Sequence, residues 1–201
     1  YKITISEGTL EPLRIGLQGQ VDGDYEKVTY FGRGPQENYS DRCDGVFLGT
    51  WKSSVEDMMI QYVYPQENGN RTGVRGIAMT DAKGKGIKVV GEQPLSVSVW
   101  NTTQAELHAA KHIGEPDVLE DAFTLNIDLA QAGVGGTDTW SRRARPYDPY
   151  RLMEKEYTYS VSTARSEMVP DALPCEVPEM MDTPPILCSY LKPPRGGFCY
   201  F

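Results

Sequence analysis

Short segments in which apolar and polar residues alternate recur along this chain of 201 residues. An alternation with a period of two places successive side chains on opposite faces of an extended backbone, which indicates a β-strand with one buried and one polar face. In residues 95–100, for instance, the apolar side chains fall on one face and both serines on the other. The pattern predicts strands at 2–5, 13–17, 27–31, 60–64, 73–79, 87–90, 95–100, 123–129 and 157–163.

Turn-forming residues separate these segments. Turn signals rich in Gly, Asn and Asp stand at 22–24, 68–70, 83–86 and 133–136, and only residues 103–112 have a helical pattern. Strands with one buried and one polar face are typical of antiparallel sheets. Many short strands joined by such turns predict an all-β fold, an antiparallel sandwich.

The last part of the chain has a different character, because seven of the 14 prolines lie from residue 166 onward. Proline cannot donate a hydrogen bond to a β-ladder, so this stretch is not a central strand. The stretch also carries Met, Ile, Leu, Tyr and Phe side chains that favour burial. We therefore expect a β-domain at 1–165 and, at 166–201, an extended proline-rich arm packed on the domain or on a neighbour.

The composition is that of a folded globular protein, and its charge excludes some partners. Hydrophobic residues make up 39% of the chain, and its formal net charge at pH 7 is −8. No run of Lys or Arg is present to neutralise phosphates, so we expect no nucleic-acid partner. No stretch approaches the roughly 20 apolar residues of a membrane-spanning helix, so we expect no membrane partner. The first residues resemble a strand and not a signal peptide, and we expect the chain to be a piece of a longer polypeptide.

The four cysteines are Cys43, Cys175, Cys188 and Cys199, and no C-x-x-C pair is present. This spacing argues against a zinc ribbon and against a thioredoxin-type motif. Two disulfides could form in an oxidising compartment. A chain of this length does not need them for stability, however, so free thiols are favoured.

Three patterns have both a functional and a structural interpretation. His108 and His112 would share one face of a helix, as in zinc proteases, but Ala109 stands where those enzymes have Glu, which favours a surface helix over a metal site. The Gly-Arg-Gly-Pro string at 32–35 lacks the third glycine of a phosphate loop, which favours a tight turn after a strand. The many carboxylates could include a glycosidase acid/base pair, but solvated or turn-capping groups are the more common case.

The segment 133–140, Gly-Val-Gly-Gly-Thr-Asp-Thr-Trp, has the most informative pattern. Its glycines, Gly136 among them, permit the close approach of a ligand, and Asp138 can accept hydrogen bonds in a turn. Trp140 offers a planar apolar face, and beside a carboxylate such a face suits the flat C–H face and hydroxyl rim of a sugar. On physical grounds alone a structural tryptophan is the more common case, so both interpretations of Trp140 stay open.

Several longer strings carry a resemblance to a known family. They are Arg-Ile-Gly-Leu at 14–17, Val-Thr-Tyr-Phe-Gly-Arg-Gly-Pro-Gln-Glu-Asn-Tyr-Ser-Asp-Arg at 28–42, Tyr-Val-Tyr-Pro-Gln-Glu-Asn-Gly-Asn-Arg at 62–71, Leu-Asn-Ile-Asp at 125–128 and Gly-Gly-Thr-Asp-Thr-Trp at 135–140. In this order they closely resemble the C-terminal domain of bacterial β-galactosidase, the domain 5 or small-chain type of glycoside hydrolase family 2. The resemblance covers residues 13–163, some three-quarters of the chain.

The resemblance implies an antiparallel super-sandwich like that of galactose mutarotases. It implies that the two catalytic glutamates and a magnesium ion belong to an upstream (β/α)₈ barrel, so this chain alone would have no catalytic residue, metal site or cofactor and no activity. It assigns substrate binding to Trp140, Asp138 and Gly136, with the tryptophan stacked on the galactoside. The implied partners are a β-galactoside and the remaining domains of the same polypeptide or a large subunit, in a homo-oligomeric parent enzyme.

Two departures from the family pattern and two rival functions accompany this expectation. Thr137 stands where the best-known members have an aspartate, which can alter the aglycone preference, and the tail after Arg165 has no counterpart. The chain could instead be a stand-alone carbohydrate-binding module, or a mutarotase-like aldose epimerase. An epimerase needs an acid and a base across the sugar ring, and two histidines four residues apart fit that need poorly.

Overall fold

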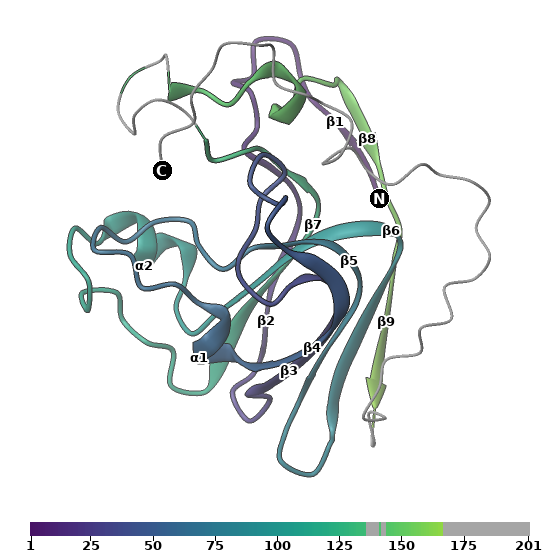
Figure 1. Ribbon diagram of the computed structural model, residues 1–201, viewed down its shortest axis with the longest axis vertical. Helices are drawn as coiled ribbons and strands as arrows, with labels where there is room; N and C mark the ends of the chain where they lie inside the picture. Colours follow the sequence, from purple (N-terminus) through teal and green to yellow (C-terminus); the bar gives the residue numbers. More distant parts are fainter. Residues whose placement is uncertain (136–140, 142–143, 167–201) are drawn as a thin grey trace.

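The computed structural model describes residues 1–135, 141 and 144–166, which are built mainly of β-strands (Figure 1). In chain order the elements are β1 (Lys2–Thr4), β2 (Arg14–Asp22), β3 (Lys27–Gly34), β4 (Phe47–Ser54), α1 (Val55–Met58), β5 (Arg71–Thr80), β6 (Gly86–Trp100), α2 (Gln104–Ala109), β7 (Ala122–Gln131), the 3-10 helix η2 (Asp148–Tyr150), β8 (Glu156–Thr158) and β9 (Val161–Ser166). No helix in the described ranges is long and apolar enough to cross a membrane.

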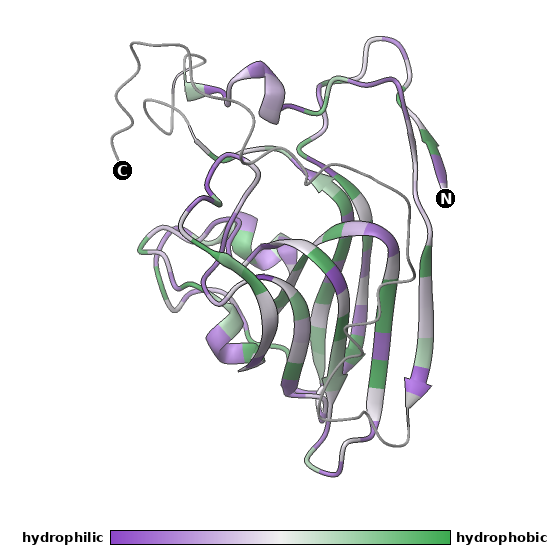
Figure 2. Ribbon diagram, turned by 45° about the vertical axis from the view of Figure 1, so that its right-hand side comes forward, coloured by the Kyte–Doolittle hydropathy of each residue, from purple (hydrophilic) through white to green (hydrophobic). Residues whose placement is uncertain are grey.

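Seven of the strands form one antiparallel sheet. Its order is β2-β7-β6-β5-β3-β4, and β9 joins it by pairing with β6. β1 pairs with β8 in a separate two-stranded sheet, and the large sheet is strongly curved (Figures 1 and 2). The expected all-β, antiparallel architecture is confirmed.

β6 is central to the large sheet, because one of its edges pairs with two different strands along its 15 residues. Its residues 86–91 pair with β9, its residues 96–100 pair with β7, and β5 pairs with both halves. The change of partner falls around Gly91 and Pro94. Proline has no N–H to donate, and a Cβ on Gly91 would lie 2.4 Å from the carbonyl oxygen of Gln93, so these two residues suit a bend between two ladders.

The hydrophobic core lies against one face of the large sheet. Along the second half of β6 and along β7, odd-numbered apolar residues belong to this core, and the even-numbered residues lie on the opposite face of the sheet. Figure 2 shows hydrophobic and hydrophilic residues alternating along strands of the sheet. Full burial of one such side chain contributes about 1.5–3 kcal/mol. The buried apolar residues of the core are Val28, Tyr30, Val55, Met58, Val74, Ile77, Met79, Val89, Leu95, Val97, Val99, Leu125, Ile127 and Tyr159.

The other face of β2, β7 and β6 carries polar side chains that bond across the strands. Gln18 Nε2 donates to Asn126 Oδ1 at 2.8 Å, and Asn126 Nδ2 donates to Ser98 Oγ at 3.0 Å, because the three residues are in direct register. The indole of Trp100 on the same face donates to the carbonyl of Asn68 at 3.0 Å. Asn68 belongs to the loop between α1 and β5, so this loop covers part of the polar face.

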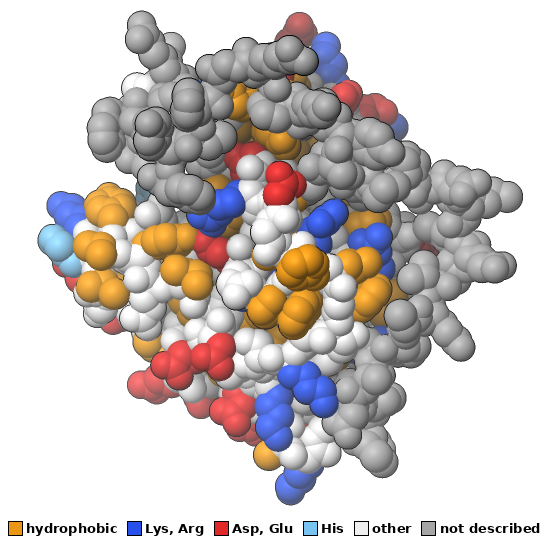
Figure 3. Space-filling model, viewed as in Figure 1, with side chains coloured by type: hydrophobic (Ala, Val, Ile, Leu, Met, Phe, Trp, Pro, Cys, Tyr) orange, Lys and Arg blue, Asp and Glu red, His pale blue; other side chains and the backbone are white. Residues whose placement is uncertain are grey.

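Residues 60–64 form a loop and not the predicted strand. The turn at Asn68 and Gly69 folds the chain back, and Asn68 Oδ1 accepts the N–H of Ile60 at 3.1 Å. Only the carbonyl of Val63, which accepts the N–H of Ile113, bonds this segment to the loop beyond α2. Its apolar side chains therefore remain exposed, and Figure 3 shows apolar side chains at the surface near α2. Local alternation was misleading here because no neighbouring strand pairs with the segment.

Other boundaries also differ from the sequence predictions. The pattern missed β4, an edge strand whose exposed Phe47 and Leu48 blur the alternation. It merged β8 and β9, which pair with different sheets. It extended the helix to residue 112, whereas α2 ends at Ala109 and begins at the Thr103 N-cap, whose hydroxyl accepts the N–H of Glu106 at 3.1 Å.

Cys43 is buried and disulfide-bonded, so the preference for a free thiol is wrong at this residue. Cys175, Cys188 and Cys199 lie outside the described residues. The predicted proline-rich arm also lies outside them, apart from residue 166 at the end of β9.

Gly16 and Gly19 in β2 allow a matched test of close packing. A Cβ on Gly16 would lie 2.0 Å from Asp128 Oδ1 and 2.6 Å from the carbonyl oxygen of Ile127, whereas a Cβ on Gly19 would meet nothing within 4 Å. We expect Gly16→Ala to lower the free energy of unfolding by about 2–3 kcal/mol, because the backbone of β7 has to move. We expect Gly19→Ala to change it by less than about 0.5 kcal/mol. Urea-induced unfolding measures both, and equal midpoints would contradict the prediction.

Candidate functional site

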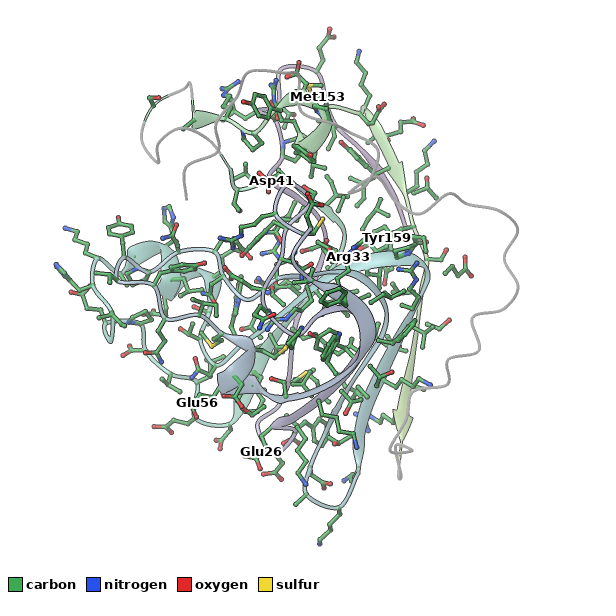
Figure 4. The ribbon with its side chains drawn as sticks, in the orientation of Figure 1. Glu26, Arg33, Asp41, Glu56, Met153 and Tyr159 are labelled. Carbon is green, nitrogen blue, oxygen red and sulfur yellow. The ribbon has the colours of Figure 1, made fainter. Side chains whose placement is uncertain are left out.

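Two loops that contain the Gln-Glu-Asn strings meet at one end of the large sheet. One loop comprises residues 35–42, which follow β3, and the other comprises residues 66–70, which precede β5. We call these two loops the loop junction, and the residues that follow β7 lie beside it. Figure 4 labels Asp41 of the loop junction, at the opposite end of the sheet from Glu26 and Glu56.

Asn38 joins the two loops and is completely buried. Its Nδ2 donates to the carbonyls of Arg33 and Gln36 at 3.1 and 2.9 Å, and its Oδ1 accepts the N–H and the hydroxyl of Thr72 at 2.9 and 2.5 Å. Its N–H donates to the carbonyl of Asn70, and Asn70 Nδ2 donates back to the carbonyl of Asn38, each at 2.8 Å. All four hydrogen-bonding positions of the Asn38 side chain are thus used.

The buried side chain of Arg71 stabilises the turn at the end of β3. Its guanidinium donates to the carbonyl of Pro35 at 2.8 Å, to the hydroxyl of Tyr30 at 3.2 Å and to the carbonyl of Gly69 at 2.9 Å. Gly32 and Gly34 belong to the last residues of β3, and the turn begins at Pro35. A buried guanidinium is stable only when its donors are occupied, and here they organise the backbone of both loops.

Glu37 makes a further link between the loops. It accepts the N–H of Gly69 at 2.7 Å and a hydrogen bond from the Tyr62 hydroxyl, and it pairs with Arg42. Gly69 has a φ of 73°, and a Cβ there would lie 2.5 Å from the carbonyl oxygen of Met58. The glycine of the second loop is therefore needed for both the backbone conformation and the space.

Tyr39 is a buried support and not a base. The Arg42 guanidinium lies 5.2 Å from the centre of its ring, within the range of a cation–π contact. Burial raises the pKa of the Tyr39 hydroxyl far above its ordinary value, and the carboxylates of Glu37 and Glu67 add to the effect. The hydroxyl therefore stays protonated at physiological pH.

Arg14 connects the sheet to the second loop. Its Nε and Nη2 donate to Asp128 Oδ2 at 3.0 and 2.6 Å, its Nη1 donates to Glu67 Oε2 at 3.2 Å, and its guanidinium lies 5.6 Å from the centre of the Trp100 ring. Burial raises the pKa of Glu67 and of Asp128, and the nearby Arg14 acts in the opposite direction on both. The two carboxyls bind one partly buried cation, Arg14, and these ion pairs hold β2, β7 and the loop together.

The first residues of the glycine-rich loop lie against Asp41. The carboxylate of Asp41 accepts the N–H of Val134 at 3.1 Å and that of Gly135 at 2.6 Å. The N–H of Gly133 donates to the carbonyl of Tyr150 at 2.8 Å, which brings the chain after the loop close to its start. The loop junction therefore holds the point at which this loop leaves β7.

The predicted sugar-binding residues Gly136, Asp138 and Trp140 lie outside the described residues. Of the two histidines, His108 is in the last turn of α2 and His112 lies beyond its end, where its Nδ1 is 2.8 Å from Glu115 Oε1. They do not share a helix face as the spacing predicted, because α2 ends earlier. Within the described ranges, no three His, Cys, Asp or Glu side chains are grouped to hold a metal ion.

Sequence reasoning missed the organising residues of the loop junction, namely Arg14, Asn38, Asp41 and Arg71. A usable signal existed for them, because Asn38, Asp41 and Arg71 lie inside two of the strings that carry the family resemblance. Arg14 had the same signal, because it begins the string at 14–17, but its partners Asp128 and Glu67 are distant in the sequence and could not be inferred.

Comparison with known proteins gives consistent matches. Residues 2–163 match the family model described as beta galactosidase small chain. The chain is similar to proteins named beta-galactosidase from Halalkalibacterium halodurans, with 40% identity over 73% of this chain, and from Leuconostoc mesenteroides, with 36% identity over 78%. A beta-galactosidase of Lactococcus lactis is 37% identical over 76% of this chain. The matched region spans only 14% of the length of each of these three relatives.

Asn38→Ala tests whether the bonds between the two loops stabilise the fold. We expect the free energy of unfolding to fall by about 2–4 kcal/mol, because the substitution leaves buried groups of both loops without partners. The matched control is Asn101→Ala, since the Asn101 side chain forms no hydrogen bond with the described residues. Thermal unfolding of both variants measures the difference, and an equal loss in the control would show that Asn38 has no special role.

Glu67 gives a prediction for pH dependence. Because burial raises the pKa of Glu67, the native state binds this proton more tightly than the unfolded chain does. The resulting stabilisation is present at acidic pH and is lost as the pH rises from the ordinary value of 4.5 through the pKa of the folded state. Glu67→Gln should remove this fall, so its free energy of unfolding should decline less with rising pH. Urea unfolding at a series of pH values tests this, and parallel curves for both proteins would refute it.

Proposed function

Since this chain belongs to the beta-galactosidase small-chain family, we propose that it is the C-terminal domain of a retaining β-galactosidase and walls the galactoside pocket with Trp140. The catalytic glutamates would lie in the part of the enzyme that precedes this domain or in a separate large subunit. The matched region is 14% of the length of the relatives, which leaves room for such a catalytic part. The isolated chain would then be inactive.

The observation that supports the proposal is the position of residues 133–135, the start of the segment that contains Trp140. Its sequence ends in Gly-Gly-Thr-Asp-Thr-Trp, and its first residues are held by a loop junction built from the family's other characteristic strings. A loop held at a rigid base is suited to present an aromatic side chain to a pocket formed by another domain. The loop junction therefore serves as the support of a substrate wall.

Trp140 would act by orientation and not by proton transfer. Its flat apolar face would stack on the C–H face of the galactose ring and exclude water from the glycosidic bond. Gly136 would let the backbone approach the substrate, and Asp138 would accept hydrogen bonds from sugar hydroxyls or from the loop itself. The reaction would use a nucleophile and an acid/base from the catalytic part, where the magnesium ion would also bind.

The first test is Trp140→Ala in the parent enzyme with a chromogenic β-galactoside. We expect KM to rise about tenfold with a smaller change in kcat, because stacking binds the ground state and the transition state alike. Trp140→Phe should restore part of the affinity, since it keeps an aromatic face. A large fall in kcat at unchanged KM would contradict this role.

A deletion separates the pocket wall from a binding appendage. Removal of the whole domain should abolish activity if the domain completes the pocket. Unchanged kcat/KM after deletion would instead indicate an appendage, and galactoside binding by the isolated chain would then identify a carbohydrate-binding module. Faster mutarotation of fresh α-galactose by the isolated chain would indicate an epimerase.

A further inference from the structure

We propose that Asp41 is a positioning residue for the sugar site, because its carboxylate holds Val134 and Gly135 at the start of the segment whose sequence contains Trp140. This inference rests on the proposed function of Trp140. Asp41 lies at the far end of the sheet from Glu26 and Glu56 (Figure 4). It is distant in the sequence from the residues it holds, so only the fold brings the two together.

The contact uses both oxygens of the carboxylate. Asp41 Oδ1 accepts the N–H of Val134 at 3.1 Å, and Oδ2 accepts the N–H of Gly135 at 2.6 Å. Hydrogen bonds from backbone N–H groups to an ionised acceptor are shorter and stronger than neutral ones. Because two successive peptide groups are bound to two different oxygens, the backbone at Val134 and Gly135 is restrained in direction as well as in position.

The glycines on either side of Val134 make this contact possible. A Cβ on Gly133 would lie 2.4 Å from Asp41 Oδ2, and a Cβ on Gly135 would lie 2.6 Å from the same atom. Either side chain would displace the carboxylate. The need for two glycines at 133 and 135 therefore follows from the approach of Asp41, in addition to any approach of a ligand.

Asp41 itself is held in a rigid turn. The backbone groups of Tyr39 and Arg42 on either side of it bond to each other, at 3.2 Å from the Tyr39 N–H and at 2.9 Å from the Arg42 N–H. Tyr39 is buried, and Arg42 is bound both to its ring and to Glu37. The position of the carboxylate is thus defined by the loop junction before the glycine-rich loop contacts it.

Gly133, at the start of the glycine-rich loop, makes a second contact, which is with the chain that follows the loop. The N–H of Gly133 donates to the carbonyl of Tyr150 at 2.8 Å. Beyond η2, Arg151 donates to both oxygens of Glu11, at 2.8 and 2.5 Å. The chain is therefore bonded both before and after residues 136–143. The Asp41 contact is made by a side chain, so a substitution can remove it, whereas the contact with Tyr150 joins two backbone groups.

The test compares Asp41→Ala and Asp41→Asn in the parent enzyme with Asp44→Asn. Asp44 is an exposed carboxylate three residues further along, which makes it a matched control. We expect Asp41→Ala to raise KM for a β-galactoside about five- to tenfold with little change in kcat. Asp41→Asn should have a smaller effect, because its amide oxygen still accepts one of the two N–H groups. Asp44→Asn should leave KM unchanged.

A double variant shows whether Asp41 acts through Trp140. In a Trp140→Ala background, Asp41→Ala should cause little further rise in KM, because the side chain that it positions is absent. Effects that multiply would overturn the inference, since Asp41 would then act independently. An unchanged KM in Asp41→Ala, with a raised KM in Trp140→Ala, would also overturn it and would leave the proposed function intact.

Trypsin cleavage after Arg142 and Arg143 supplies a readout that does not depend on activity. Loss of the anchor should make Asp41→Ala cleave there faster than Asp44→Asn, at a temperature where thermal unfolding shows both to be folded. Equal cleavage rates would refute the anchor. If Trp140→Ala leaves KM unchanged, the proposed function fails, and the cleavage rates still decide whether Asp41 holds the loop.

Discussion

The reciprocal hydrogen bonds between Asn38 and Asn70 are the interaction on which the functional end of this domain depends. They join a loop that follows β3 to a loop that precedes β5, at 2.8 Å in each direction. β3 and β5 are neighbours in the sheet, so these bonds continue the pairing of the two strands into irregular chain. A backbone outside regular structure must find partners for its polar groups, and here buried amide side chains provide them.

The remaining contacts of the loop junction build outward from this pair. Arg71 and Glu37 bind backbone groups of the loops, and Asp41 extends the same framework to the start of the glycine-rich loop. Arg14 ties the second loop to β7 through Glu67 and Asp128. The side chains of Arg71, Glu37, Asp41 and Arg14 are thus engaged in holding loops and strands together.

The strand pattern could be predicted wherever one face of a strand meets the core. It located β5 and β7, and it found both halves of β6, which it predicted as two strands at 87–90 and 95–100. Two of its failures have identifiable reasons. Residues 60–64 alternate but have no strand beside them, and β4 is an edge strand with exposed apolar residues. Period-two alternation reports which residues could face a core, but it does not report whether a partner strand exists.

The sequence by itself determined the fold class, the family and the composition of the glycine-rich loop, because these depend on local periodicity and on contiguous strings. Only the tertiary structure decided that Asn38 meets Asn70, that Arg14 lies between Asp128 and Glu67, and that Asp41 contacts Val134 and Gly135. These contacts join residues far apart in the chain, and their energy depends on burial and on the geometry of two partners at once. Neither quantity is a property of any local stretch of sequence.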